Sequence, residues 1–527
     1  MKILTQQDIH LIIQLFNQEK FDDVLSQVKK FLKNNKKEVF LWNILGASCE
    51  RLGKIHEAKE AYEEAITINR NIPEVLFNLG AIKLNLNDPI GAISLFEEVV
   101  KIKPDMAEAY FSQGAAYSQI GDLNQSIASY KKAIETQPGY YEACNNLGSV
   151  YQRLGSHDEA VAAYQKSIQI YNNPRAHFNL AGALRNNGLL KDAIKEYEQA
   201  ITLSSREPEF FSDLGDALWH DGNIKDAEKF LRQAVQMQPL HAKANYQLGV
   251  FLYDNDKLDE ALIFFKNSKI YDYESRALYC LYKLKRFDEF YSELSRLSAK
   301  PNNSPLLATL STHYALNFNK QDIYNFCPNP LDHIYHAELP ELLKDNSRLI
   351  KELLKDIQQA DIAERQQSRL YFGSQSAGNL FKRPEQSFQK LALSLKGAIK
   401  KYFEVYKDEQ STFIKLFPQE IDFSSSWYVK MKRGGHLTSH IHEEGWISGA
   451  VYLMIPKERE EPEEGAIELS VHGDNYPNEH NQFPTKTILP KEGEVVFFPS
   501  SVFHRTIPFN SNEERVCIAF DLKPREL

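Results

Sequence analysis

The chain lacks the features that mark several other classes of protein. Its 527 residues include only five cysteines, scattered and without any CxxC pair, so neither a disulfide framework nor a zinc-ribbon pattern is present. No uninterrupted apolar run is long enough to span a bilayer, and no cleavable apolar stretch follows the first residues. The net charge of -9 argues against a nucleic-acid partner. We therefore expect a cytoplasmic protein with reduced thiols and with no nucleic-acid or membrane partner.

What the chain does contain is an ordinary globular composition spread over more than one domain. Apolar residues make up 43% of the sequence and charged residues 25%. A chain of 527 residues is too long for one hydrophobic core. We expect two or three domains.

Residues 1–300 contain an internal repeat with a period of 34 residues. Small residues recur at this spacing, with one deletion before the fifth: Gly46, Gly80, Gly114, Gly148, Ala181, Gly215 and Gly249. Seven positions after each comes a residue suited to a turn: Gly53, Asn87, Gly121, Gly155, Gly188, Gly222 and Asp256. Aromatic residues follow at a fixed distance in most units: Tyr62, Phe96, Tyr130, Tyr164, Tyr197 and Phe265.

This pattern predicts two antiparallel helices per unit. A small residue lets the helices approach closely, a turn residue ends the first helix, and an aromatic ring fills the adjoining groove. The pattern resembles the tetratricopeptide repeat family, with a degenerate opening unit at 5–36 and a shortened closing pair at 274–297. The resemblance implies an all-α solenoid over 1–300 whose groove binds a protein or peptide. Residues 301–324, rich in Pro and Asn, are expected to be a connector.

Residues 325–527 predict a second architecture. Two amphipathic helical stretches, 338–360 and 384–406, flank a polar, Gly-containing segment at 369–381 that we expect to be a loop near the site. From about residue 424 the hydrophobic period becomes that of short strands. Six are expected: 425–432, 445–455, 465–473, 493–499, 504–509 and 515–522. Helices followed by antiparallel strands favour an α+β domain with a double-stranded β-helix, or jelly-roll, core.

The last strands carry the residues that point to chemistry. His440 and His442 are two residues apart, so on an extended segment both side chains point to the same side and can reach one metal ion. His504 follows a buried strand and a turn, as a third ligand would. Three imidazoles suit Fe(II), and Arg515 offers a planar fork for a carboxylate. Tyr452 has a hydroxyl that could donate to the same carboxylate.

The segments 426–456 and 489–522 resemble the Fe(II)/2-oxoglutarate-dependent oxygenase superfamily. The similarity is greatest to a bacterial branch often fused to tetratricopeptide repeats, and more distant to prolyl hydroxylases. It implies that His440 and His504 bind iron and that Arg515, assisted by Tyr452, binds the far carboxylate of 2-oxoglutarate. Fe(II), 2-oxoglutarate and O2 are the implied cofactor and co-substrates.

One position departs from the superfamily, which usually has Asp or Glu two residues after the first histidine. Here that position is His442. Three interpretations remain open at this point: His442 binds the metal, Glu443 or Glu444 binds it instead, or the metal has only two protein ligands. We favour His442, because residues two apart on a strand share a face.

The sequence thus predicts a 2-oxoglutarate-dependent Fe(II) dioxygenase that hydroxylates a protein, peptide or small molecule recruited by the repeats. Two other functions stay open. The chain could be a repeat-based binding scaffold with an inactive oxygenase domain, since position 442 departs from the pattern. It could instead carry a cupin-like sugar-binding or isomerase site, in which Arg515 would lack a role.

Overall fold

The computed structural model describes residues 4–187, 189–300, 304–359, 362, 364–365, 369–376, 379–443, 445–479 and 482–523. It divides into two compact units, Met1–Ser205 and Arg206–Leu527. The site residues of the sequence analysis all lie in the second unit.

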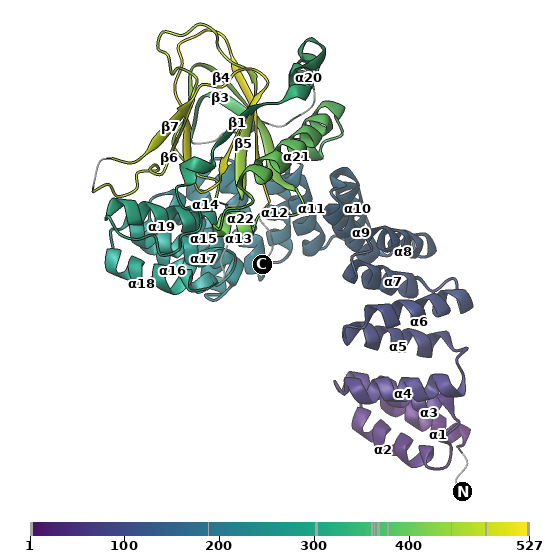
Figure 1. Ribbon diagram of the computed structural model, residues 1–527. Helices are drawn as coiled ribbons and strands as arrows, with labels where there is room; N and C mark the ends of the chain where they lie inside the picture. The colour runs from purple at the N-terminus through teal and green to yellow at the C-terminus, as the bar shows by residue number, and fades with distance from the viewer. Residues whose placement is uncertain are drawn as a thin grey trace. The chain divides into compact units, whose positions relative to one another are not determined.

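The first unit is a succession of helix–turn–helix pairs, visible in Figure 1 as stacked helices. Its helices are α1 (Gln6–Asn17), α2 (Phe21–Leu32), α3 (Val39–Arg51), α4 (Ile55–Ile68), α5 (Pro73–Asn85), α6 (Pro89–Ile102), α7 (Ala107–Gln119), α8 (Leu123–Thr136), α9 (Tyr141–Leu154), α10 (His157–Ile170), α11 (Pro174–Asn186) and α12 (Leu190–Leu203). The pair α1 and α2 occupies the segment expected to be a degenerate opening unit.

The regular spacing of small and aromatic residues has a steric reason. A Cβ atom on Gly46 would lie 2.6 Å from the ring of Tyr62, and one on Gly148 would lie 2.7 Å from the ring of Tyr164. Only glycine therefore lets each ring pack against the preceding helix. At the turns, Gly53 and Gly155 have φ of +73° and +80°, a left-handed conformation that disfavours side chains with a Cβ.

The second unit begins with further helices of the same kind. They are α13 (Pro208–His220), α14 (Ile224–Met237), α15 (Ala242–Asp254), α16 (Leu258–Ser268), α17 (Tyr273–Lys283), α18 (Phe287–Ser298) and α19 (Pro305–Asn317). The pair α17 and α18 lies in the segment expected to be a shortened closing pair. The segment expected to be a connector contains α19, capped by the hydroxyl of Ser304, so the helical array extends beyond residue 300.

The remainder of the second unit contains two antiparallel sheets. The strands are β1 (Tyr335–Glu338), β2 (Glu364–Arg365), β3 (Leu370–Ser376), β4 (Phe423–Leu437), β5 (Ile447–Met454), β6 (Ile467–Ser470), β7 (Thr485–Ile488), β8 (Glu494–Pro499), β9 (Phe503–Thr506) and β10 (Arg515–Leu522). The larger sheet has the order β1-β8-β5-β10-β4-β3-β2 and the smaller β7-β6-β9. All six expected strands are present. The loop expected at 369–381 is wrong for 370–376, because β3 pairs with β4 there.

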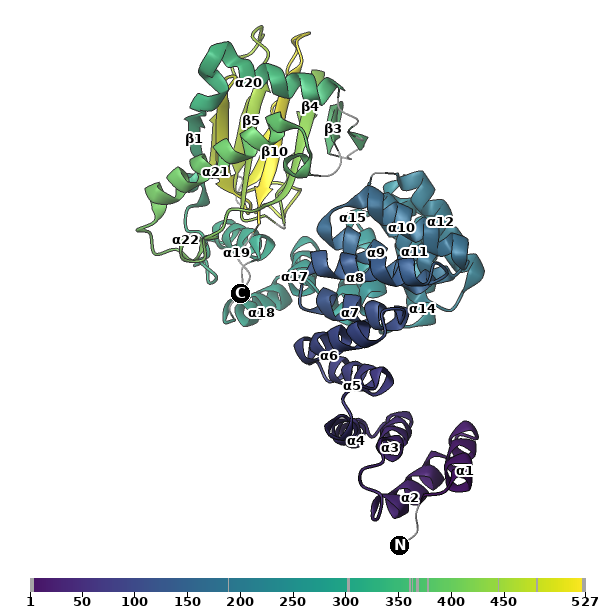
Figure 2. The ribbon, with the colours of Figure 1, turned by 90° about the vertical axis from the view of Figure 1, so that its right-hand side faces the viewer.

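Alternating residues of the larger sheet face two different cores. On β10, Val516, Ile518 and Phe520 belong to the core shared with the helices. Those helices are α20 (Pro340–Gln359), broken by non-helical backbone at 344–347, and α21 (Gln386–Tyr406). Figure 2 shows both lying across the sheet. The opposite face packs on the smaller sheet through a second core that includes Val429, Val496 and Leu469.

Short elements complete the fold: α22 (Thr412–Lys415) and the 3-10 turns η1 (Pro330–His333) and η2 (Leu380–Lys382). No helix in the described part of the chain combines the length and apolar character needed to cross a bilayer. The expected architecture of a repeat solenoid followed by a domain of helices and antiparallel sheets is confirmed.

Candidate metal and 2-oxoglutarate site

Two of the three histidines are placed side by side by backbone pairing. His440 follows β4, and His504 lies on β9. The backbone N–H of His440 donates to the carbonyl of His504 (3.1 Å), and the N–H of His504 donates back to the carbonyl of His440 (2.9 Å). His442 follows on the same loop, where its N–H donates to the carbonyl of Ser500 (3.2 Å). Segments about sixty residues apart thus meet at one point.

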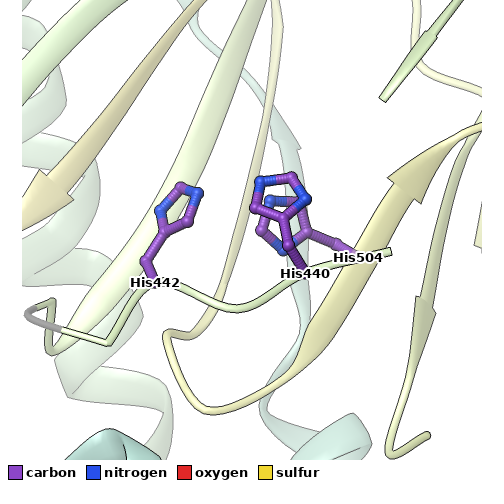
Figure 3. Close-up of side chains that lie close together, drawn as sticks. All are labelled: His440, His442 and His504. Atoms are coloured by element: carbon purple, nitrogen blue, oxygen red, sulfur yellow. The ribbon is translucent and has the colours of Figure 1, made fainter. Parts of the chain in front are cut away.

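The three imidazoles form a group with the spacing of a metal site. One ring nitrogen of each lies within 4.8 Å of those of the other two. Figure 3 shows the three side chains together, with His440 and His442 on one loop. Each Nδ1 faces an acceptor, which favours the tautomer that leaves Nε2 free for a metal. The acceptors are the carbonyl of Thr438 for His440 (2.7 Å), the carboxylate of Asp521 for His442 (2.5 Å) and the carbonyl of Val502 for His504 (3.5 Å).

Burial keeps the ring nitrogens of His440 and His504 available to a metal. Burial, reinforced by the charge of His442, lowers the pKa of His440 to about 3. Burial also lowers the pKa of His504 well below its ordinary value, and the neighbouring histidines add to the effect. Both imidazoles are therefore neutral near pH 7, which is the form that donates a lone pair to a metal.

Asp521, the carboxylate behind His442, was not among the residues predicted from the sequence. Burial opposes its ionised form, but the charge of His442 and hydrogen bonds from His442, Ser448 and Ser425 outweigh this effect and lower the pKa of Asp521. The side chain is therefore an anion at neutral pH. A carboxylate that accepts from the far nitrogen of a ligand imidazole orients the ring and makes it a stronger donor. The sequence contains one indication of Asp521: side chains alternate along a strand, so positions 515 and 521 lie on the same face as each other.

Arg515 is a buried cation at the start of β10, only 2% exposed. Its Nε donates to the carbonyl of Gly465 (3.0 Å), and its Nη1 contacts the sulfur of Cys517 (3.7 Å). Among the described residues, no carboxylate lies within ion-pair distance of its guanidinium. A buried charge without a counter-charge is unfavourable, so this position suits an anionic ligand.

Tyr452 lies beside that cation. Its ring centroid is 5.2 Å from the guanidinium carbon of Arg515. Its hydroxyl is buried and has no hydrogen-bond partner among the described residues. Burial raises the pKa of Tyr452, an effect that Arg515 partly offsets, so the hydroxyl stays protonated and can donate. An orphaned donor next to an unpaired cation is what a carboxylate ligand would satisfy.

One cavity of about 740 Å³ is lined by the five residues predicted from the sequence, namely His440, His442, His504, Tyr452 and Arg515. Its walls are not confined to the sheets, since the repeat helices α15 and α17 contribute Tyr253, Asp254, Arg276 and Tyr279. A cavity of this size accommodates a dicarboxylate together with part of a second molecule. Helices α15 and α17 therefore line the same cavity as the candidate site residues.

Glu443, the alternative third ligand of the sequence analysis, is engaged elsewhere. Its carboxylate accepts from the hydroxyl of Tyr253 (3.0 Å) and forms an ion pair with Arg276 (2.9 Å), both on repeat helices. The side chain of His442 instead joins the group of His440 and His504. Glu444 lies outside the described residues.

Two kinds of protein family match separate parts of the chain. Residues 425–521 match the family described as "Putative 2OG-Fe(II) oxygenase". Tetratricopeptide-repeat families match residues 41–72, 73–106, 114–155, 141–174, 174–241 and 212–271. The chain thus contains tetratricopeptide repeats, and its C-terminal region contains a segment that matches the putative 2OG-Fe(II) oxygenase family. No curated relative matches it.

Several solved structures are similar to parts of the chain. MamA is 29% identical over 30% of this chain and 94% of its own, with a TM-score of 0.30. YrrB, described as a TPR protein with an unusual peptide-binding site, is 21% identical over 35% of this chain and 96% of its own, with a TM-score of 0.31. A thermophilic TPR protein of Thermus thermophilus is 23% identical over 34% of this chain and 100% of its own, with a TM-score of 0.30.

Proposed function

We propose that this protein is an Fe(II)- and 2-oxoglutarate-dependent dioxygenase that hydroxylates a substrate brought to it by the repeats. One observation carries the proposal: a group of three histidines shares a cavity with a buried guanidinium that has no carboxylate partner among the described residues. The histidines suit a divalent iron ion, and the guanidinium suits the far carboxylate of 2-oxoglutarate. The match of residues 425–521 to the oxygenase family supports the same function.

The residues present fit both groups. The imidazoles at positions 440, 442 and 504 would hold the metal, and three protein ligands leave positions for the co-substrates. When bound, Fe(II), 2-oxoglutarate and O2 supply oxidative decarboxylation of the 2-oxo acid and oxidation of a substrate C–H bond. Arg515 would bind and orient the far carboxylate, with Tyr452 donating its hydroxyl proton to the same group.

His442 is the third metal ligand in this proposal. Two contacts support it over Glu443: the carboxylate of Asp521 orients the imidazole of His442, while Arg276 and Tyr253 hold the carboxylate of Glu443. Asp521 would also keep a negative charge close to a site that lacks the usual carboxylate ligand. The carboxylate of Asp521 would therefore supply a compensating anion to a site with three histidine ligands.

The proposal also includes the partner and the location. The tetratricopeptide-repeat solenoid presents a groove suited to an extended peptide or a helix, so we propose a protein or peptide partner. A cytoplasmic location is consistent with the five free cysteines, all of which are buried thiols.

The test is an anaerobic titration of the Fe(II)-loaded protein with 2-oxoglutarate, monitored by the weak visible metal-to-ligand charge-transfer band. We expect the band in the wild type, a much weaker dependence on 2-oxoglutarate in Arg515→Ala, and loss of iron in His442→Ala. Glu443→Gln is the matched control and should keep the band, because its amide oxygen can still accept from Tyr253 and Arg276 and hold the loop. Iron binding that survives in His442→Ala but not in Glu443→Gln would reverse the ligand assignment. Absence of bound iron and of any band in the wild type would leave the repeat-based binding scaffold as the better account.

A further inference from the structure

The repeat helices contribute a charged side chain to the cavity that the proposed chemistry does not use. Asp254 is the last residue of α15 and lines the cavity that also contains the three histidines. Asp254 is not one of the candidate metal ligands, and it lies on a helix rather than on the strand that carries Arg515. Its contacts therefore indicate which other molecule could enter the cavity.

The other carboxylates of the cavity wall already have partners. The guanidinium of Arg276 lies between Asp272 (3.0 Å) and Glu443 (2.9 Å), and so is shared by two carboxylates. Asp474 accepts from the hydroxyl of Tyr279 (2.7 Å) and lies 3.6 Å from Arg369. Asp521 is bound by His442 and by two serines. The positive groups near Asp254 are thus engaged with other anions.

Asp254 itself has no hydrogen bond or ion pair with any residue that the structure describes. The side chain of Asp254 is exposed to the solvent of the cavity, and the nearby protein partly desolvates its carboxylate. This desolvation, together with the charge of Glu443, raises the pKa of Asp254 to about 6, although Arg276 and Arg369 act in the opposite direction. The carboxylate is still mostly ionised at pH 7, and among the described residues no protein cation forms an ion pair with it.

The cavity wall therefore carries two charged groups of opposite sign, Arg515 and Asp254, neither of which forms an ion pair with a described residue. Arg515 suits the carboxylate of 2-oxoglutarate, and Asp254 suits a cation. A neutral substrate would leave Asp254 uncompensated, and an acidic one would be repelled by it. A substrate with an ammonium or guanidinium group would form a charge-assisted hydrogen bond there.

We propose that Asp254 is a specificity-determining residue by which the repeat helices select a substrate with a basic group for the site beside the three histidines. That the bound molecule is a substrate rests on the proposed function, whereas the selection of a cation rests only on the cavity. The basic group can come from a lysine or arginine side chain of a peptide or from a free amine.

The test measures binding of matched probes to the full-length protein by calorimetry under anaerobic conditions, with and without Fe(II) and 2-oxoglutarate. The probes are three terminally blocked hexapeptides that differ only in a central Lys, Gln or Glu, together with butylamine. We expect the Lys peptide to bind about tenfold more tightly than the Gln peptide, as one charge-assisted hydrogen bond would give. Tighter binding of the peptide than of butylamine assigns the basic group to a polypeptide, and the reverse assigns it to a small amine.

Two variants determine whether Asp254 is responsible. Asp254→Asn keeps the size of the side chain and should abolish the preference for Lys over Gln. Asp256→Asn, an exposed acid two residues later that does not line the cavity, should keep it. Equal binding of the Lys and Gln peptides to the wild type, binding of no probe, or a preference that survives in Asp254→Asn would overturn the proposal. A preference that depends on Asp254 in a protein without a charge-transfer band would retain cation selection and reject the oxygenase function alone.

Discussion

The guanidinium of Arg276, on repeat helix α17, lies 2.9 Å from the carboxylate of Glu443, one residue beyond His442. The hydroxyl of Tyr253, on α15, donates to the same carboxylate. The other histidine segment is also anchored by the helical array, because the hydroxyl of Thr309 on α19 donates to the carbonyl of Ser501 (2.7 Å). The helices thus hold both segments that carry the candidate ligands, and the geometry of the site depends on them.

Replacing Arg276 should disturb the candidate metal site. Arg276→Met removes a buried cation and leaves Asp272 and Glu443 without their shared partner, a change that costs about 3 kcal/mol. We expect a lower melting temperature and weaker binding of Co(II), a spectroscopic substitute for Fe(II) that is followed by its visible bands. The double variant Arg276→Met/Glu443→Gln should recover part of both losses, because it removes the unpaired anion.

The control for this prediction is Arg286→Met on the following helix, where a more exposed arginine pairs with Glu289. Its melting temperature and Co(II) spectrum should resemble those of the wild type, since exposed ion pairs contribute little. Unchanged Co(II) binding in Arg276→Met would show that the helices do not position the histidine loop.

We expect Arg515 to destabilise the ligand-free protein and to stabilise its complex with 2-oxoglutarate. In Arg515→Met the buried charge is gone, so the melting temperature without ligand should equal or exceed that of the wild type. The rise in melting temperature that 2-oxoglutarate produces in the wild type should disappear, and binding should weaken by about 2 kcal/mol, roughly thirtyfold. Arg505→Met, which removes a half-exposed arginine paired with Glu468 near His504, should keep the ligand-induced rise. A wild-type melting temperature that is indifferent to 2-oxoglutarate would contradict this prediction.

His313 should make the stability of the second unit depend on pH. It lies buried on α19, where Nδ1 is 2.7 Å from the hydroxyl of Tyr282 and Nε2 is 2.8 Å from Nδ1 of His472. Burial, with a smaller contribution from the charge of His472, lowers the pKa of His313 to about 3. The unfolded chain takes up a proton that the folded chain excludes, so this contribution to stability is complete above about pH 6.5 and is lost as the pH falls toward 3.

Between pH 7 and pH 5 the loss from His313 should reach about 2 kcal/mol. His313→Gln should therefore be less stable than the wild type at pH 7 but should lose less stability on acidification. His56→Gln, which changes an exposed histidine of the first unit, should leave the pH profile unchanged. Thermal unfolding followed by circular dichroism at several pH values measures both effects, and parallel profiles for His313→Gln and wild type would contradict the assignment.

Gly148 should be intolerant of a side chain although it lies within a helix. A Cβ there would lie 2.7 Å from the ring of Tyr164, so Gly148→Ala should destabilise the first unit by about 1–2 kcal/mol despite the higher helix propensity of alanine. Gly139→Ala is the control, because a Cβ at Gly139 meets nothing within 4 Å. A melting temperature of Gly148→Ala at or above that of Gly139→Ala would show that Tyr164 can move aside.

Much of the fold was predictable because its signals are local. The 34-residue period reports a steric contact between a small residue and a ring in most units, as Gly148 and Tyr164 show. Strand β10 was predictable because Val516, Ile518 and Phe520 face one core while the residues between them face the other side. Strand β3 was not, because its polar sequence forms a strand only by pairing with β4. The break in α20 at 344–347 was missed because its amphipathic pattern continues on both sides.

The sequence by itself determined the repeat array, the helical and strand-rich regions, and the candidate residues His440, His442, His504, Tyr452 and Arg515. These follow from spacing along the chain, and spacing controls which side chains share a face. Only the tertiary structure decided that Glu443 is held by Arg276 and Tyr253, that Asp521 stands behind His442, and that Asp254 lines the same cavity. Those relationships join residues from about eighty to about two hundred positions apart. Their partners are chosen by the packing of helices against sheets, which no local pattern records.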